Sequence, residues 1–535
     1  MNRNRSISFH HPVAFWIGCI AIIGGVLSHM PMFMMGRHNG YQMVGMPMDT
    51  PMLIGMAMVP FGVLLSAYGL MPRIGRMAKS EHGGSHLQFH VADGVPLNAE
   101  HWKLVIVLVI ALAVDVLKPA TLGFVMPGMT REYEISKETA GVLALVALTG
   151  TTVGSVVWGR IADVFGRRAA ILLSALMFIG TAICGAMPAF GWNLAMCFLM
   201  GASAGGLLPI TFTLMAESVP AAHRGWLLVA LGGVGTSAGY LLAAGSAAWL
   251  VPEFSWRALW LLGLPTGLVI VFLGRYIPES PRFLSNAGLV DEAREVLERF
   301  TGAGAAGTTG EAVVVEAVED EPGAGLAQLL RSSHARITWG LMVCGIAWGL
   351  VNFGFLLWLP TNLGTMGMDT SAASALLARS ALLALPGIGL VIWLYHRWSS
   401  IKALVLFIVL TTATLLLFVA MSMVKVQSSL AIVAATALLL VSSSGVIAML
   451  IPYAAEIYPV HLRGTGSGVI AASSKFGGIV GAGLGVMGVF THFGTSALLI
   501  AVPMAVAAAL LIRSGIETRG QRLEEIQRAL HLRAR

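Results

Sequence analysis

The stretch that decides the fold is Gly159-Arg160-Ile161-Ala162-Asp163-Val164-Phe165-Gly166-Arg167-Arg168, which lies between two long apolar segments. It is too short to be a domain, yet it carries three arginines and one aspartate. Such charged residues cost roughly 2.5–3.5 kcal/mol each at the centre of a membrane-spanning helix. We therefore expect a turn at a membrane face, where the glycines permit a tight reversal of the chain. By its charge alone, the stretch also fits a turn that only sets topology.

The composition is that of a polytopic membrane protein. Of the 535 residues, 56% are hydrophobic and 11% are charged, whereas a soluble domain carries about 25% charged residues. The net charge of +7 fits cationic cytoplasmic loops and does not indicate a nucleic-acid partner. The four cysteines lie inside apolar segments and form no CxxC pair or disulfide framework, so we expect small core residues rather than thiol ligands.

The apolar segments predict fourteen membrane-spanning helices, since about 20 apolar residues cross a bilayer. Basic residues cluster on alternate connections, which predicts that both termini are cytoplasmic in a bacterial-type inner membrane. The predicted parts are a two-span extension with a methionine-rich external loop (1–78), a histidine-containing cytoplasmic linker (79–102), a first six-helix bundle (103–278), a cytoplasmic linker with short helices (279–334), a second six-helix bundle (335–514) and a cytoplasmic tail (515–535).

Several motifs resemble those of the major facilitator superfamily of transporters. The opening stretch fills every position of the G-x-x-x-D-x-x-G-R-R signature between the second and third spans of that family. The segment Pro278-Glu279-Ser280-Pro281-Arg282-Phe283-Leu284 resembles the P-E-S-P-R box of sugar porters and metabolite symporters. An E-x6-R-G pair occurs at equivalent places in both halves, as expected for a repeated six-span unit. The two pairs are Glu217 with Arg224, and Glu456 with Arg463.

The resemblance covers roughly residues 103–513 and implies an all-α fold of two six-helix bundles, with a substrate site between them and alternating access. It also implies a gate of charged residues at the cytoplasmic face. The implied gate residues are Gly159, Arg160, Asp163, Gly166, Arg167, Arg168, Glu217, Arg224, Glu279, Arg282, Glu456 and Arg463. After the eighth span, His396-Arg397-Trp398-Ser399-Ser400 keeps only scattered basic character. We therefore expect the C-terminal half to lack the full charge lock.

Ionisable residues inside a span are functional-site hypotheses, because they are expensive in a bilayer. Within the family, the chain resembles the aromatic-acid and niacin-type symporters. In those symporters the first span reads D-G-x-D-x4-G-x3-P. Asp115, Gly123 and Pro127 fit this pattern, and Lys118 stands in place of the second aspartate. Asp115 and Lys118 are three residues apart, so they can face each other on one helix. They predict either a self-neutralising pair or a titratable carboxylate beside a substrate-binding ammonium.

Further cations favour an anionic substrate. Cys197 stands where the related symporters have an arginine in the fourth span. Arg379 lies in the eighth span and Lys475 in the eleventh, and with Lys118 they predict a net-positive cavity suited to an organic acid. Arg379 could alternatively extend to a lipid headgroup. Asn352 is a polar candidate for lining the site, and aromatic side chains such as Tyr240 could line it or serve only in packing.

The loop of the extension is rich in methionine. Thioether sulfur is a soft ligand that suits Cu(I), so this loop predicts a metal-binding segment on the external face. Alternatively, methionine serves there only as an adaptable apolar residue. The candidate ligands are Met30, Met32, Met34, Met35, His38, Met43, Met46 and Met48.

Three functions are compatible with these features. The first is secondary transport of a small organic anion by alternating access, expected to be proton-coupled. The second is transport of copper or another soft metal through the methionine-rich loop, and the third is a membrane sensor with a transporter scaffold. No enzyme is expected, because metal triads, nucleophile–base motifs and phosphate loops are missing. The expected partners are the lipid bilayer, the anionic substrate and H⁺, with no cofactor except the Cu(I) alternative; the oligomeric state stays open.

Overall fold

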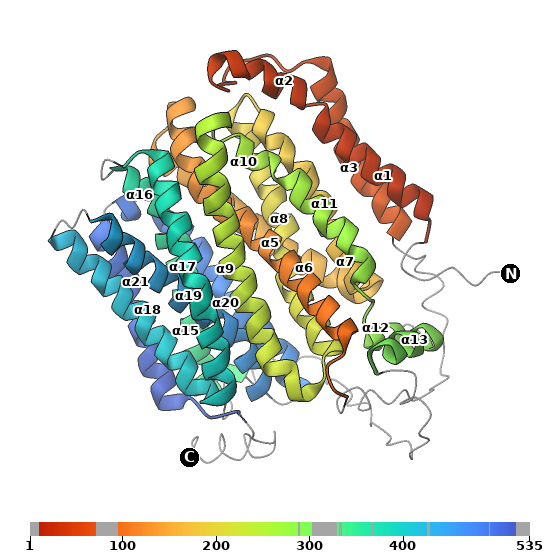
Figure 1. The fold of residues 1–535 in the computed structure, drawn as a ribbon, viewed down its shortest axis with the longest axis vertical. Coiled ribbons are helices and arrows are strands. Elements are labelled where there is room, and N and C mark those ends of the chain that lie inside the picture. The colour runs from red at the N-terminus through yellow and green to blue at the C-terminus, as the bar shows by residue number, and fades with distance from the viewer. Residues whose placement is uncertain are drawn as a thin grey trace. The chain divides into compact units, whose positions relative to one another are not determined.

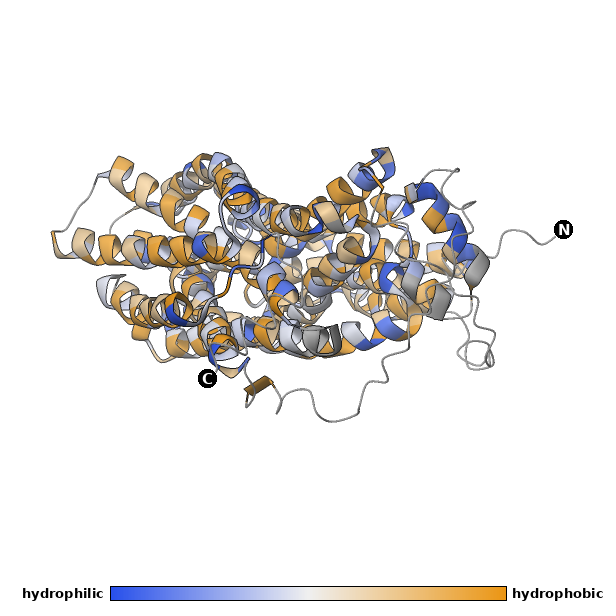
Figure 2. Cartoon of the chain, turned by 90° about the horizontal axis from the view of Figure 1, so that it is seen from below, coloured by the Kyte–Doolittle hydropathy of each residue, from blue (hydrophilic) through white to orange (hydrophobic). Residues whose placement is uncertain are grey.

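The fold follows the apolar pattern of the sequence. The computed structural model describes residues 10–70, 95–286, 289–301, 329–330, 334–365, 368–424, 428–458, 460–491 and 493–519. These residues form helices without any β-strand, and fourteen helices are long and apolar enough to cross a membrane. The predicted all-α fold and the fourteen spans are therefore confirmed. Figure 2 shows hydrophobic residues along most of the helices, as a bilayer requires.

The N-terminal extension is a pair of helices packed through small residues. Its elements are α1 (Pro12–Leu27), α2 (Met30–Met35), the 3₁₀-helix η1 (Gly36–Asn39) and α3 (Thr50–Leu70). Helices α1 and α3 lie side by side along their length (Figure 1). A Cβ atom on Gly18 would lie 2.6 Å from the carbonyl oxygen of Gly62, so the two backbones touch. Such close approach through small residues is the usual way that helices associate in a bilayer.

The next six spans and two short helices have these bounds: α5 (Ala99–Glu132), α6 (Lys137–Phe165), α7 (Arg167–Gly180) with η3 (Thr181–Ala186), α8 (Phe190–Ser218), α9 (Ala221–Phe254), α10 (Ala258–Leu261) with α11 (Gly263–Leu273) and η4 (Gly274–Tyr276), α12 (Pro281–Asn286) and α13 (Val290–Thr301). The extension packs on α7, where a Cβ atom on Gly180 would lie 2.5 Å from the Val59 side chain. The extension is thus attached to the third span of the first six.

The last six spans have these bounds: α15 (Ala335–Leu350) with the π-helix η6 (Val351–Leu356) and α16 (Leu359–Thr365), α17 (Thr370–Arg397), α18 (Ser400–Met423), α19 (Ser429–Ile457), α20 (Val460–Val486) with η7 (Val489–Thr491), and α21 (Phe493–Ser514). The π-turn interrupts a span that the sequence predicted as continuous. Gly354 in this turn packs against the ring of Phe490. π-Turns inside helices frequently mark functional positions.

By packing, the chain divides into two compact units. The first takes residues 1–118, 150–227 and 257–316, and the second takes residues 119–149, 228–256 and 317–535. Three of the boundaries fall inside α5, α6 and α9, so the compact units differ from the two halves of the sequence. The predicted division into bundles, linkers and tail stays a prediction. Most of the histidine-containing linker, the acidic segment after α13 and the end of the tail lie outside the described residues.

Candidate transport site and gates

The first candidate is a buried ion pair on α5. Asp115 and Lys118 are 5% and 1% exposed, and the Lys118 Nζ lies 3.5 Å from an Asp115 carboxylate oxygen. The same ammonium lies 4.0 Å from the ring centroid of Phe178 on α7, a position that favours a cation–π contact. Desolvation of two charges offsets much of their attraction, so such a pair is weak evidence for stability. We therefore retain it as a candidate for function.

The fourth span supplies no cation at the expected position. Cys197 on α8 is fully buried there. The nearby Cys184 thiol on η3 donates to the side-chain oxygen of Asn193 at 3.2 Å, so this region of the interior is packed with small polar groups. The positive partner of Asp115 therefore comes from its own helix, one turn away, rather than from α8.

In the second unit, Asn352 ties the π-turn to α19. Its amide nitrogen donates to the Ser443 hydroxyl and to the Trp348 carbonyl oxygen, at 3.1 Å each. The Trp348 indole N–H donates to the Ser443 carbonyl oxygen at 2.9 Å. Asn352 is half-buried, and its position at a π-turn is typical of a functional polar group.

The two predicted cations of the second unit differ in their surroundings. Arg379 is exposed on α17 and shares a helix face with the exposed side chains of Leu382, Leu390 and Trp393. This apolar face favours the alternative in which Arg379 extends to a lipid headgroup. Lys475 on α20 is half-buried. The structure thus pairs Asp115 with Lys118, whereas Asn352, Arg379 and Lys475 lie in the second unit on three separate helices.

Two buried hydroxyls on α9 add to the polar groups of the second unit. Ser237 and Tyr240 lie one turn apart, and neither hydroxyl has a hydrogen-bond partner among the described residues. The Tyr240 ring lies 6.1 Å from that of Phe124, measured between centroids. A buried hydroxyl without a partner costs about 1–3 kcal/mol, so these two groups are candidates to bind a ligand. Spacing alone could not single out Ser237, because serine is common in the apolar spans.

The predicted gate turn is held by Glu279. Its carboxylate accepts hydrogen bonds from the backbone N–H groups of Arg167 at 2.7 Å, Arg168 at 3.2 Å and Ser280 at 3.0 Å. Glu279 therefore caps the start of α7, where backbone N–H groups have no partner within the helix. Gly166 has φ +103°, and a Cβ atom there would lie 2.3 Å from a Glu279 oxygen. Only glycine suits both the backbone and the space.

The arginines of the gate make further contacts. The Arg167 guanidinium lies 3.4 Å from Glu217 and 3.8 Å from Asp163, whose side chain is 72% exposed. Because exposed pairs contribute little, the Glu217 contact is the stronger of the two. Arg224 donates to the Val219 carbonyl oxygen at 3.4 Å, and Arg160 is exposed. The side chains of two further predicted gate residues, Arg282 and Arg463, lie outside the described ones.

The C-terminal half has a lock of different chemistry. Glu517 accepts from the backbone N–H of Ser400 at 3.0 Å and from its hydroxyl at 2.6 Å, and the Ser399 hydroxyl also donates to it. Thr518 then donates to Glu456 at 2.6 Å, and Tyr395 donates to the same carboxylate oxygen at 3.0 Å. The described donors to these two carboxylates include hydroxyls and a backbone N–H group, and the absence of a full charge lock in this half stays a prediction.

A repeat in the sequence could have revealed this second lock. Ile516-Glu517-Thr518 follows the twelfth span of the two bundles, as Pro278-Glu279-Ser280 follows the sixth. In each half the glutamate caps the third span, which is α7 for Glu279 and α18 for Glu517. The opening motif would recur after the eighth span, whereas the chemistry that the two halves share lies after the twelfth.

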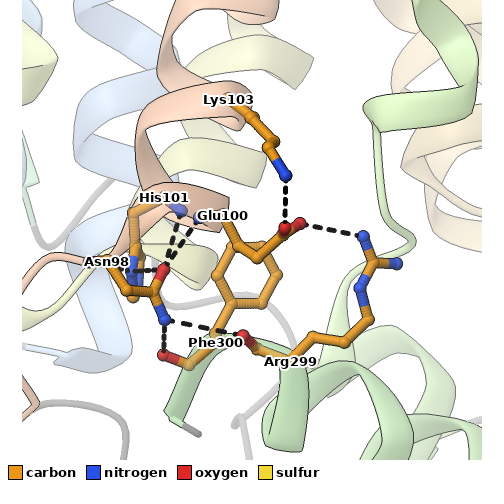
Figure 3. A network of polar contacts seen from close by, with 6 residues as sticks. All are labelled: Asn98, Glu100, His101, Lys103, Arg299 and Phe300. Carbon is orange, nitrogen blue, oxygen red and sulfur yellow. Dashed lines mark hydrogen bonds and ion pairs between the residues drawn. The ribbon is translucent and has the colours of Figure 1, made fainter.

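One asparagine joins α13 to α5, which is the first span after the N-terminal extension. Asn98 accepts from the backbone N–H groups of Glu100 at 3.0 Å and His101 at 3.1 Å, and donates to the Phe300 carbonyl oxygen at 2.6 Å. It therefore caps both the start of α5 and the end of α13 (Figure 3). An ion pair of 3.1 Å between Arg299 and Glu100 reinforces this junction.

The second unit contains an interlock between the two halves of the sequence. A Cβ atom on Gly123 of α5 would lie 2.6 Å from the Leu357 carbonyl oxygen, and one on Gly141 of α6 would lie 2.8 Å from the Trp358 ring. The Arg131 side chain donates to the Thr370 hydroxyl at the start of α17. The predicted topology places this interlock at the extracellular ends of the spans.

The chain is similar in sequence to known transporters. A family model described as Major Facilitator Superfamily matches residues 105–482. The niacin transporter NiaP of Acinetobacter baylyi is 27% identical, over 81% of this chain and 98% of its own length. The 4-hydroxybenzoate transporter PcaK of the same organism is also 27% identical, over 83% and 98%. The Escherichia coli metabolite transport protein YgcS is 30% identical, over 73% and 86%.

A solved structure shares the fold. The proton:xylose symporter XylE, solved with 6-bromo-6-deoxy-D-glucose, has a TM-score of 0.63 and 17% sequence identity. The similarity covers 81% of this chain and 99% of that protein. At this identity the likeness concerns the fold and does not extend to the ligand.

The ion pair on α5 makes a prediction about stability. Asp115→Asn or Lys118→Met alone leaves one buried charge uncompensated, which typically costs about 3–5 kcal/mol. The double variant Asp115→Leu/Lys118→Met removes both charges and should unfold near the wild-type temperature. Thermal unfolding of the detergent-solubilised protein measures this. Lys103→Met, at an exposed pair, is the control and should shift stability by about 1 kcal/mol or less. Single variants no less stable than this control would contradict the prediction.

The two capping glutamates predict opposite pH dependences. Burial raises the pKa of Glu279 to about 7, against the opposing effect of the N–H groups of Ser280, Arg167 and Arg168. The folded chain then holds a proton that the unfolded chain releases from about pH 4.5, so stability decreases as pH rises from about 4.5 to 7. Burial also acts to raise the pKa of Glu517, but hydrogen bonds led by those of Ser399 and Ser400 lower it overall. Glu517 therefore stabilises the fold above its ordinary pKa and loses this effect as pH falls.

Melting temperatures of Glu279→Gln and Glu517→Gln between pH 4 and pH 8 test these signs. We expect Glu279→Gln to lower the melting temperature least at pH 8, and Glu517→Gln to lower it most at that pH. Parallel pH profiles for the two variants would show that the two caps do not differ in this way.

Proposed function

Because the chain belongs to the major facilitator superfamily, we propose that it is a secondary transporter of small aromatic carboxylates that works by alternating access. It is an integral multi-pass membrane protein, as the fourteen apolar helices and the family both require. Its relatives are transporters, not enzymes, in agreement with the expectation from the sequence. The charge asymmetry of its connections supports cytoplasmic termini, and the bacterial relatives support a bacterial inner membrane.

The names of the relatives carry the substrate proposal. They include transporters for niacin and 4-hydroxybenzoate, and a gallate transporter of Pseudomonas putida that is 25% identical over 79% of this chain. Each of these three compounds is a carboxylate on an aromatic ring. The chain offers matching chemistry in buried or half-buried positions: the ammonium groups of Lys118 and Lys475, and the Ser237 and Tyr240 hydroxyls. An organic anion therefore fits these groups better than a neutral sugar does.

The ion pair on α5 supports a mechanism of proton coupling. At a separation of 3.5 Å, Asp115 neutralises Lys118 while no substrate is bound. When Asp115 takes up a proton, Lys118 loses its partner and attracts the carboxylate of the substrate. One proton and one anion thus enter together, and the net charge around Lys118 stays constant. Because a buried ammonium is stable only beside an anion, neither ligand is expected to move alone.

Uptake into proteoliposomes tests this function. We expect labelled niacin, 4-hydroxybenzoate or gallate to accumulate when the outside is more acidic, and a protonophore to abolish the accumulation. Asp115→Leu/Lys118→Met, expected to be folded, should accumulate none of the three. Lys475→Ala should lower uptake, and Arg379→Ala should leave it nearly unchanged. If wild-type protein binds these acids without moving any of them, the sensor hypothesis is favoured instead, and uptake of Cu(I) alone would favour the metal transporter.

Cross-linking the interlock of the second unit tests alternating access. Its contacts at Gly123, Gly141 and Arg131 must separate each time the extracellular side opens. In the variant Arg131→Cys/Thr370→Cys, a cleavable bifunctional thiol reagent long enough to replace the arginine should link the two positions and stop uptake. A reductant should restore it. The four native cysteines are buried, so they leave a low background.

The two single-cysteine variants, treated with the same reagent, are the matched controls and should retain uptake. Full uptake by the completely linked double variant would exclude an opening at this interlock.

A further inference from the structure

A histidine in the N-terminal extension has an unusual environment. His29 lies between α1 and α2 and is 1% exposed. Its Nδ1 lies 2.8 Å from the Gly25 carbonyl oxygen. A carbonyl oxygen only accepts, so Nδ1 carries the hydrogen and Nε2 carries the lone pair. Nε2 is buried and has no hydrogen-bond partner among the described residues. This is the tautomer in which histidine binds a metal through Nε2.

The register of the two helices places two methionines at the level of His29. The His29 ring packs on Gly55 of α3, where a Cβ atom would lie 2.9 Å from its Cε1 atom. Met52 lies one turn earlier on α3, which runs antiparallel to α1, and so lies at the level of His29 and of the turn that follows. Met32 lies in that following turn, on the same helix face as His29. Met52 is fully buried and Met32 is 2% exposed, so both side chains point inward.

We propose that His29 Nε2 and the sulfur atoms of Met32 and Met52 form a Cu(I) site at the external end of the extension. One imidazole and two thioethers make a soft ligand set, which selects Cu(I) over Zn²⁺ or Mg²⁺. The described residues contain no group of three or more His, Cys, Asp or Glu side chains that could hold a metal ion. The flexible methionine side chains adapt to the geometry that the fixed imidazole sets.

This site differs from the one that the sequence predicted. Three of the eight candidate ligands, Met34, Met35 and His38, are exposed. Two of the three proposed ligands, His29 and Met52, were not among the eight. The proposal does not depend on anion transport, because all three ligands belong to the extension. Helix α2 contacts η3, which continues the third span, so an occupied site would stiffen the extension where it meets the first bundle.

Metal titration of the purified full-length protein tests the proposal. Ag(I) serves as a redox-stable probe, and Cu(I) under reductant is measured in competition with a chromophoric chelator. His29→Asn is the sharpest variant, because its amide nitrogen replaces Nδ1 as donor to Gly25 and only Nε2 is lost. Met32→Leu and Met52→Leu exchange sulfur for carbon at nearly constant volume. The matched control is the triple variant Met34→Leu/Met35→Leu/His38→Asn.

We expect one bound metal ion per chain in the wild type and in the control. Each of the three site variants should weaken binding by at least about tenfold, the lower bound even for loss of an outer-shell partner. One equivalent of Ag(I) should also raise the melting temperature of the wild type and the control but not that of His29→Asn. The melting temperature without metal verifies that each variant is folded. Wild-type affinity in His29→Asn, or loss of binding in the control alone, would overturn the proposal.

Discussion

The constraint on which the structure depends is that a polar group removed from water must find a partner. Away from water this partner is worth several kcal/mol, and the start of every helix presents N–H groups that need one. Glu279 supplies it for α7, Glu517 for α18 and Asn98 for α5. Glu279 and Glu517 come from segments distant in sequence, and Asn98, which precedes α5 directly, also donates to the distant Phe300 carbonyl oxygen, so each cap also joins two parts of the chain. The caps therefore hold the tertiary structure as well as the helices.

The same constraint explains why few ionisable groups occur inside the spans. Asp115 and Lys118 meet it by pairing their opposite charges within a single turn of α5. Cys197 can therefore stand on α8 in place of an arginine. A pair of this kind can exchange partners, because a proton on the carboxylate frees the ammonium for another anion. His29 meets the constraint only in part: one nitrogen has a carbonyl partner and the other has none among the described residues. A ligand gains the most binding free energy at a buried polar group that has no other partner.

Small residues decide how closely the elements carrying these groups approach. At Gly166, a positive φ and the nearness of the Glu279 carboxylate leave room for no side chain. At Gly123 and Gly141, contacts with Leu357 and Trp358 join helices from the two halves of the sequence. Such contacts are rigid while they persist, yet they involve few polar bonds. Under the proposed alternating access, such contacts suit an interface that opens repeatedly.

The sequence by itself determined the fold class and the fourteen spans, because the bilayer allows few ways to place apolar segments and charges. It also identified Asp115 with Lys118, since three residues apart on a helix is a local relation. Only the tertiary structure decided that Arg379 shares an apolar exposed face, that Glu517 accepts hydrogen bonds from Ser399 and Ser400, and that Met52 is buried while Met34 and Met35 are exposed. Burial and partners of these residues depend on neighbours distant in sequence. A pattern along one helix cannot specify them, because the packing of other helices determines which face is covered.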